Sequence, residues 1–360
     1  MKEIIRFELK KIVSIRKAVL LGIVLSAVCI GSFAIISAMG NWKGAAEMLS
    51  FYRGSVENNP RIEAAKERYE ELCAQYIDKG IEMDEQTNEE WLDLEYPLWL
   101  ENVDEIRKAN LPKFGFEAET LIIGNTVFYG FLEEFIANYV PFILGFVISF
   151  LIAPVFASEY ANRMDGLLLS SRHGKRKLIF AKFIAAGLVI LGVYSFVLCV
   201  FILLSLGVHG LGDLDASFVL AADNVFIYLT SPFNFLAGEY ILVMFGYSIL
   251  GCLGLGCLTL FISSKCKSAV SASMVSLAIA YIPVLVFKMY GRNEGIVPNF
   301  LRLFHGAVMG VRTLFSDYFP VQIGAVTMTM PVISITLLCI SSILFAIFAF
   351  RGFQKHQIST

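Results

Sequence analysis

Charged residues are scarce in this sequence. Asp, Glu, Lys and Arg make up 17% of its 360 residues and hydrophobic residues make up 57%, whereas soluble domains carry about 25% charged residues. A protein core of this size cannot bury such an excess of apolar side chains, which indicates that the chain lies in lipid. With 28 Gly, 10 Pro and 7 Cys, the composition also excludes a disordered chain, a collagen-like chain and a disulfide scaffold. A pI near 6.1 argues against a nucleic-acid binder.

Sequence motifs of catalysis are missing as well. The four His residues are scattered through different loops, so neither an H-E-x-x-H site nor a His cluster exists. No G-x-x-x-x-G-K-[ST] phosphate-binding loop occurs, so any ATPase must be a separate polypeptide. We therefore predict no catalytic residue, no metal site and no cofactor in this chain, and disfavour an enzyme.

Six long stretches contain no Asp, Glu, Lys or Arg. A bilayer core needs about 20 consecutive apolar residues in a helix, and each of these stretches is long enough. They predict an all-α membrane protein with spans at residues 18–39, 135–158, 183–207, 240–263, 268–287 and 327–350. Because proton and sodium carriers use ionisable groups inside their helical bundle, uncharged spans disfavour an ion-coupled carrier.

The charges between the spans alternate in sign. Residues 1–17, 159–182, 264–267 and 351–360 hold 16 Lys or Arg and 4 acids, a net charge of +12, and the remaining segments hold 13 and 27, a net charge of −14. Since cytoplasmic loops are enriched in Lys and Arg, both termini are predicted in the cytoplasm, at the plasma membrane. The alternative for residues 1–39 is a cleaved signal peptide, but its apolar region would be 22 residues long and no A-x-A-like site follows.

Several helices are predicted outside the spans. Residues 1–17 form an amphipathic helix with a basic side for anionic lipid heads. The acidic region 40–134 is a helical extracellular domain, in which one helix begins at Asn59-Pro60 and ends at Gly80. A second begins at Thr87 and ends at Pro97, and a third covers Leu98 to Ala109. Residues 208–239 form an external loop, and residues 288–326 contain interfacial helices on the outer leaflet or, alternatively, a loop packed on the extracellular domain.

The cytoplasmic loop at 159–182 contains the most informative pattern. An acid, Glu159, ends the second span, Gly166 follows seven residues later with Leu167 to Leu169 after it, and a basic stretch leads to Lys182 before the third span. This order resembles the first cytoplasmic loop of type-2 ABC transporter (ABC-2) permeases. The resemblance extends to the N-terminal elbow helix, the six spans with both termini inside, and the short basic tail; the 95-residue external region is longer than in many members.

The resemblance implies a coupling role for this loop. A short helix at Asp165 to Ser171 would seat Leu167 and Leu168, with Leu169 beside them, in a groove of a separate ATPase chain that binds ATP and Mg. Glu159 and Arg163 would fix the angle of that helix, with Gly166 in its first turn. The partners implied are two ATPase chains, a second copy of this chain and membrane lipid. The alternative is a basic loop that holds anionic lipid.

Two further sets of residues are candidates for a substrate path or a dimer interface. Tyr139, Phe142, Phe146 and Phe150 share one helical face of the second span and would suit an amphipathic cargo. Ser273 and Ser276 are small residues in the fifth span that let helices approach closely. Core or lipid packing is the alternative for the aromatic residues.

Together with the resemblance to ABC-2 permeases, these observations predict the membrane subunit of a homodimeric peptide exporter that works by alternating access. The alternatives are drug or sodium efflux, or a peptide sensor or immunity protein.

Overall fold

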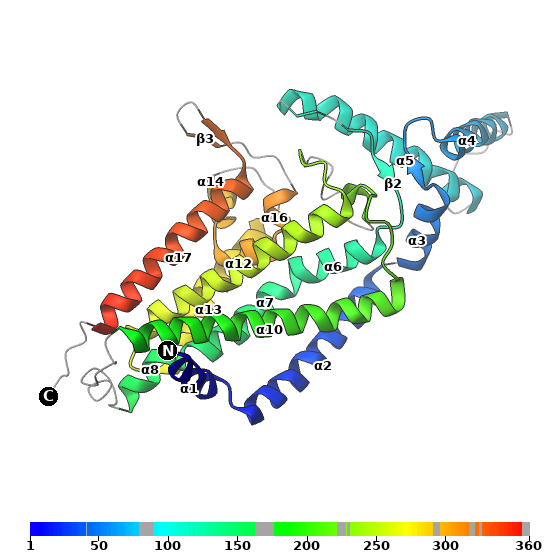
Figure 1. Cartoon of the computed structure of the whole chain (residues 1–360). Coiled ribbons are helices and arrows are strands. Elements are labelled where there is room, and N and C mark those ends of the chain that lie inside the picture. The colour runs from blue at the N-terminus through cyan, green and yellow to red at the C-terminus, as the bar shows by residue number, and fades with distance from the viewer. Residues whose placement is uncertain are drawn as a thin grey trace.

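The computed structural model is a helical bundle with a helical cap (Figure 1). It describes residues 1–40, 42–78, 89–114, 116–117, 119–162, 176–221, 228, 231–290, 296–316, 321–323 and 326–354. Six candidate membrane spans occur among these residues, as predicted. They are formed by α2 (Ile15–Met39), α7 with α8 (Val140–Ile152, Pro154–Ala161), α10 (Lys177–His209), α12 (Ala237–Ser263), α13 (Ala269–Tyr290) and α17 (Met330–Gln354).

Helix α12 occupies the centre of the bundle and packs against α7, α10, α13 and α17. Small residues allow this close packing. A Cβ on Gly251 would lie 2.8 Å from the backbone nitrogen of Met309, so only glycine permits the neighbouring backbone to come this near. Helix α2 lies at the edge, where it packs against α10 (Figure 1). We call the end that contains the short helix α1 (Lys2–Ile12) the α1 end and the opposite end the cap end.

The cap, residues 42–123, contains α3 (Trp42–Phe51), α4 (Pro60–Asp78), α5 (Glu89–Asn110) and the 3₁₀ helix η1 (Leu111–Phe114). Helix α4 agrees with the predicted helix between Asn59-Pro60 and Gly80. The predicted end of a helix at Pro97 is wrong, because α5 continues through this proline. Packing of α5 against α4, with Leu100 and Val103 buried, offsets the missing backbone hydrogen bond. Strands β1 (Gly54–Ser55) and β2 (Ile122–Ile123) pair antiparallel beneath these helices.

The helical segment that contains the second span extends beyond its uncharged stretch and is built in pieces. Helix α6 (Val127–Asn138) leads directly into α7 and α8, with interruptions at Tyr139 and Ala153, two residues and one residue before a proline. Proline lacks a backbone N–H and favours the first turn of a helix, which explains these positions. Helix α10 similarly starts at Lys177, before the predicted residue 183. Helix α6 includes the charged residue Glu133, and α10 includes Lys182 near its start.

The segment between α13 and α17 differs from the predicted interfacial helices. Helices α14 (Ile296–Leu301), α15 (His305–Gly310) and α16 (Arg312–Phe315) are short, and all of α15 is buried. Helix α15 packs against α12, α7 and α13 and therefore lies inside the bundle. A Cβ on Gly306 would lie 2.6 Å from the carbonyl oxygen of Ala280, so glycine is what lets α15 enter. A surface position is therefore wrong for α15. For the rest of the segment, in which Phe300 of α14 is 58% exposed, both expectations stay predictions.

Three short features complete the chain. The 3₁₀ helix η2 (Phe218–Leu220) lies between α10 and α12. Strands β3 (Val321–Ile323) and β4 (Val326–Met328) pair antiparallel and precede α17, in a region where the sequence predicted only helix. Helix α17, the last helix in the described part of the chain, begins at Met330, shortly after β4.

Candidate functional site

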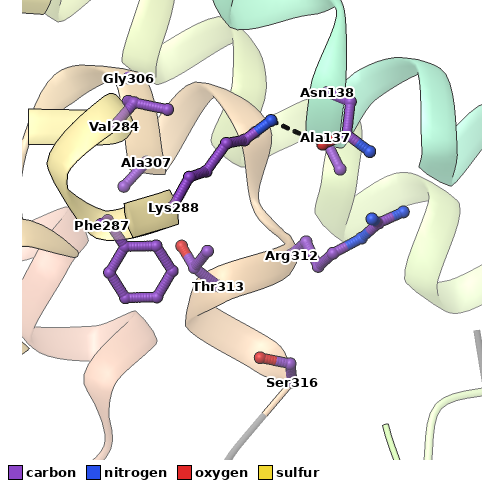
Figure 2. Close-up of a pocket in the computed structure, with 11 residues that line it drawn as sticks. Ala137, Asn138, Val284, Phe287, Lys288, Gly306, Ala307, Arg312, Thr313 and Ser316 are labelled. Atoms are coloured by element: carbon purple, nitrogen blue, oxygen red, sulfur yellow. Dashed lines mark hydrogen bonds between the residues drawn. The ribbon is translucent and has the colours of Figure 1, made fainter. Parts of the chain in front are cut away.

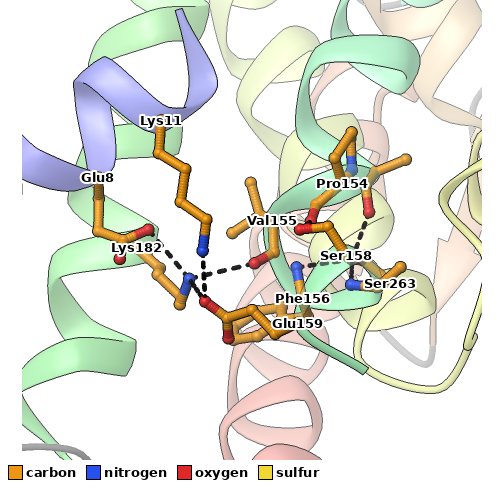
Figure 3. A network of polar contacts seen from close by, with 11 residues as sticks. Glu8, Lys11, Pro154, Val155, Phe156, Ser158, Glu159, Lys182 and Ser263 are labelled. Carbon is orange, nitrogen blue, oxygen red and sulfur yellow. Dashed lines mark hydrogen bonds and ion pairs between the residues drawn. The ribbon is translucent and has the colours of Figure 1, made fainter. Parts of the chain in front are cut away.

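A buried ion-pair network lies at the α1 end of the bundle (Figure 3). Lys182 Nζ, on α10, lies 2.6 Å from Oε1 of Glu159 on α8 and 2.9 Å from Oε2 of Glu8 on α1. The same ammonium donates to the carbonyl oxygen of Val155 at 3.1 Å. The side chains of Lys182, Glu159 and Glu8 are 0%, 1% and 2% exposed. Three helices, of which α1 is distant in the sequence from α8 and α10, therefore meet at one ammonium group.

Lys11 completes the charge balance of this network. Its Nζ lies 2.7 Å from Oε1 of Glu159, while its side chain remains 39% exposed. Two ammonium groups thus face two carboxylates. Removing charges from water costs several kcal/mol per ion, and close pairing offsets part of this cost. Oε2 of Glu159 is buried and has no hydrogen-bond partner in the described part of the chain. Removal of one member of the network would leave a further buried charge without compensation.

Glu8 was not among the residues predicted to act here, although a signal was present. In the sequence it shares the apolar side of the N-terminal helix with Ile4, Ile5 and Ile12, because these residues are three or four positions apart. An acid on the buried side of a helix requires a partner of opposite charge. Glu8 is 2% exposed, and α1 packs against α10 through this face.

Helix α8 is also held by the ends of α12 and α17. The Ser263 hydroxyl donates to the carbonyl oxygen of Ala153 at 2.6 Å and accepts from the backbone nitrogens of Phe156 and Ala157, both at 3.1 Å. It thereby satisfies backbone groups left unpaired where Pro154 interrupts the span (Figure 3). The ring of Phe353, near the end of α17, lies 4.9 Å from that of Phe156. Four helices, α1, α10, α12 and α17, thus converge on α8.

A second buried cluster lies at the cap end. Glu133, on α6, is 1% exposed. It accepts from Nε of Arg312 at 2.6 Å and from the hydroxyl of Tyr228 at 2.8 Å, and it also contacts Nη2 of Arg312. The same guanidinium donates to Glu134 at 2.6 Å, and Tyr240, at the start of α12, lies 2.9 Å from the Tyr228 hydroxyl. These bonds join α6, α16 and α12.

Arg107 connects the cap to this cluster. This side chain of α5 is 1% exposed. Its guanidinium donates to the carbonyl oxygens of Tyr228 at 3.0 Å and Ser231 at 2.9 Å, and to Oδ1 of Asn234 at 2.7 Å. Burial lowers the pKa of Arg107 to about 10, so the group remains charged at neutral pH. The cap is therefore fixed to the segment that precedes α12.

The comparisons with known proteins agree with this architecture. A family model described as ABC-2 family transporter protein matches residues 3–357, nearly the whole chain. The chain belongs to this family. No curated protein matches the sequence. As an ABC-2 permease it is a membrane transport component and not itself the catalytic part, and the family normally works with an ABC ATPase.

In this permease, the predicted coupling segment lies mostly outside the described residues. Arg163, Asp165, Gly166, Leu167, Leu168 and Leu169 all fall in the range 163–175, which the structure does not describe. Glu159 is described and lies at the α8 end of the loop, and Lys182 lies at its α10 end. Both residues belong to the buried network, so the two ends of the loop are joined to each other and to α1.

The predicted path residues have different surroundings. Phe146 and Phe150 are 53% and 38% exposed, with ring centroids 4.5 Å apart. Phe142 instead stacks on Tyr281 of α13, with ring centroids 5.1 Å apart, and Tyr139 stacks on the buried ring of Phe135. The four aromatic residues therefore do not form one open wall within a protomer.

Ser273 and Ser276 are 2% and 0% exposed, and each hydroxyl donates to a backbone carbonyl of its own helix, at 2.6 and 2.8 Å. This burial favours packing within one protomer, and their predicted part in a path or dimer contact stays a prediction. The exposed residues between positions 269 and 276 of α13 are Val270, Ser271, Met274 and Val275. In the described ranges, no group of three or more His, Cys, Asp or Glu is placed to hold a metal ion.

Proposed function

We propose that this ABC-2 permease exports amphipathic or hydrophobic peptides from the cell. In this proposal two copies form the path by alternating access, and two ATPase chains bind the loop at 159–182. The proposed coupling between the ATPase chains and the permease is supported by the ion-pair network of Lys182, Glu159 and Glu8. It joins both ends of the loop to α1, so a displacement of the loop would move α8, α10 and α1 together.

The charges support the proposed orientation of the permease. The described parts of the segments with net charge +12 lie at the α1 end, and the cap belongs to the segments with net charge −14. Positively charged segments remain in the cytoplasm. The α1 end and the ATPase partners would therefore be cytoplasmic, and the cap would face outward from the plasma membrane.

Two features favour an amphipathic cargo over an ion. The exposed rings of Phe146 and Phe150 offer aromatic surface on the second span. The buried charged residues Lys182 and Glu133 lie near the ends of the bundle and are paired. Ion-coupled carriers place ionisable groups along the pathway, so an external energy source such as ATP fits this arrangement better.

Transport into inverted membrane vesicles tests the function directly. Vesicles that contain the permease and its ATPase should accumulate a labelled amphipathic peptide only when ATP is present. Accumulation of ethidium or sodium ions instead would favour drug or sodium efflux. Peptide binding without ATP-dependent accumulation would favour the sensor or immunity function.

Coupling is tested separately by co-purification. Leu168→Asp should abolish retention of the ATPase, because a charged side chain would have to enter an apolar groove. Leu211→Asp is the matched control, since Leu211 is 51% exposed and follows the C-terminal end of α10, far from the loop at 159–182 in the sequence. Equal retention of the ATPase by both variants would contradict the assignment of the coupling segment.

A further inference from the structure

A cavity of about 260 Å³ opens at the cap end of α13 (Figure 2). Six of its lining residues are apolar or glycine, namely Ala137, Val284, Phe287, Gly306, Ala307 and Gly310. Pockets for small molecules typically measure about 300–1,000 Å³. This cavity is slightly smaller, which suits a head group or part of a hydrocarbon chain better than a whole cargo molecule.

One cation lies at the mouth of this cavity. Lys288 Nζ donates to Oδ1 of Asn138 at 3.1 Å and lies 5.5 Å from the centroid of the Phe142 ring. An ammonium has three N–H donors, and Asn138 takes one of them. Among the residues that the structure describes, no carboxylate lies within ion-pair distance of Lys288. This cation therefore retains capacity for an anionic ligand.

The second cationic side chain in the cavity lining, Arg312, is already paired with carboxylates. Arg312 directs its guanidinium away from Phe287 and Thr313 in Figure 2, toward the carboxylates of Glu133 and Glu134. Glu134 in turn accepts from Nδ2 of Asn138 at 2.5 Å. Because this bond fixes the amide, the Asn138 oxygen faces Lys288 and holds the ammonium at the mouth.

The position of Lys288 relative to the bilayer indicates the kind of ligand. The candidate span of α13 is Ala269–Met289, so Lys288 lies at its end, where lipid head groups meet the hydrocarbon core. The nearby surface is apolar, with Met289 and Phe300 85% and 58% exposed. Lipid chains can cover such a surface while a head group reaches the cavity.

We propose that this cavity binds the head group of an anionic phospholipid from the surrounding leaflet. Lys288 pairs with the phosphate, and the apolar lining contacts the first part of the acyl chain. The Thr313 hydroxyl is buried and has no hydrogen-bond partner in the described part of the chain, so it offers a second polar group in the lining. The bound lipid would bridge α13, α6 and α15 independently of the cargo.

Native mass spectrometry of the purified, delipidated permease tests this site. Phosphatidylglycerol and phosphatidylcholine with identical acyl chains are added in parallel. Both head groups carry a phosphate, but the choline cation of phosphatidylcholine would be repelled by the Lys288 ammonium, so we expect the wild type to retain phosphatidylglycerol about 10-fold more tightly. Lys288→Gln should remove this preference and Lys288→Arg should keep it.

Two variants make the test specific. Lys43→Gln is the matched control, since Lys43 follows α2 at the same end with a side chain 89% exposed, and it should behave as the wild type. Ala307→Leu fills the cavity without changing its charge and should reduce labelling of α13 by a diazirine-bearing phosphatidylglycerol. Equal retention of both lipids by the wild type, an unchanged preference in Lys288→Gln, or binding of oleate without phosphatidylglycerol would overturn the proposal. Lys288 is exposed, so its substitution leaves the fold intact and the result decisive.

Discussion

Lys182 Nζ lies 2.6 Å from Oε1 of Glu159, and the loop at 159–182 begins and ends at these two residues. The ion pair therefore closes the loop at its base. Glu8 adds α1 to the same ammonium. In the proposed coupling, a displacement at either end of the loop would therefore reach α8, α10 and α1 together.

Replacement of Lys182 should destabilise the permease strongly. Lys182→Met leaves Glu8 and Glu159 with only the half-exposed Lys11 as a cation. Loss of one partner from a buried ion pair costs about 3–5 kcal/mol, and we expect a loss of this size. Thermal unfolding in detergent measures it. Lys177→Met, on the exposed first residue of the same helix, should change the stability by less than about 0.5 kcal/mol.

The same network predicts a specific rescue. Adding Glu8→Gln to Lys182→Met restores charge balance, because Glu159 then pairs with Lys11 alone. The double variant should be more stable than the sum of the two single effects by about 0.5–3 kcal/mol. Glu3→Gln, an exposed acid on the same helix, should give no such rescue. Additive effects for Glu8 and Lys182 would contradict a shared ion pair.

Attachment of the cap should depend on Arg107. Arg107→Ala removes three hydrogen bonds and leaves the carbonyl oxygens of Tyr228 and Ser231 without this donor. Each hydrogen bond to a charged group contributes about 1.5–3 kcal/mol, so the cap should loosen. Faster amide hydrogen exchange at 231–236 would reveal the change.

The neighbouring residue provides a control for Arg107. Lys108, whose side chain is 36% exposed, pairs with the exposed Glu57 and with Asp104, whose side chain is 5% exposed. Both partners lie in the cap and not in the segment 231–236, so Lys108→Ala should leave exchange at 231–236 unchanged. If both variants had the same effect, Arg107 would not be the link between the cap and the bundle.

Alanine substitutions at two glycines of α12 should have different effects on the stability of the permease. A Cβ at position 251 would press on the backbone of Met309, whereas a Cβ at Gly246 meets nothing within 4 Å. Overpacking typically costs about 1–3 kcal/mol, so Gly251→Ala should destabilise the permease. Gly246→Ala should be neutral or stabilising by up to about 1 kcal/mol, because alanine favours helix. Thermal unfolding of the two variants under identical conditions would show the contrast.

The six spans were predictable because their uncharged stretches exceed the length of a bilayer core. The first residues of the helices were not predictable, because each span was assumed to contain no charged residue. Lys182 and Glu133 lie within longer helices because partners from other segments neutralise them. Two of these partners, Glu8 for Lys182 and Arg312 for Glu133, are 174 and 179 positions away, and local sequence does not report such pairing. Glu8, on an apolar helix face, was the one local sign of it.

The buried helix α15 was missed for a related reason. Its flanking Arg302 and Arg312 suggested an amphipathic surface helix, but Arg312 is paired with Glu133 inside the protein. Gly306 and Gly310 are four residues apart, a spacing typical of helices that pack closely in membranes. This glycine spacing, more than the alternation of apolar and basic residues, indicated that α15 packs inside the bundle.

Two native cysteines allow a test of the orientation. Cys73 lies in the cap and Cys266 lies in the turn between α12 and α13 at the α1 end, and both are partly exposed. Since the basic segments should be cytoplasmic, a membrane-impermeant maleimide should label Cys73 but not Cys266 in intact cells. After permeabilisation both should react. Cys199 and Cys339 are replaced by Ser beforehand, because they are exposed on candidate spans.

Single variants assign the label to each position. Cys73→Ser should abolish labelling of intact cells, and Cys266→Ser should abolish only the increase on permeabilisation. The opposite pattern would place the cap in the cytoplasm, and an ATPase could then reach only the cap end. The coupling role of the loop at 159–182 and the outward direction of transport would both fail on that result, whereas lipid binding at Lys288 would stand, because phospholipid is present in both leaflets.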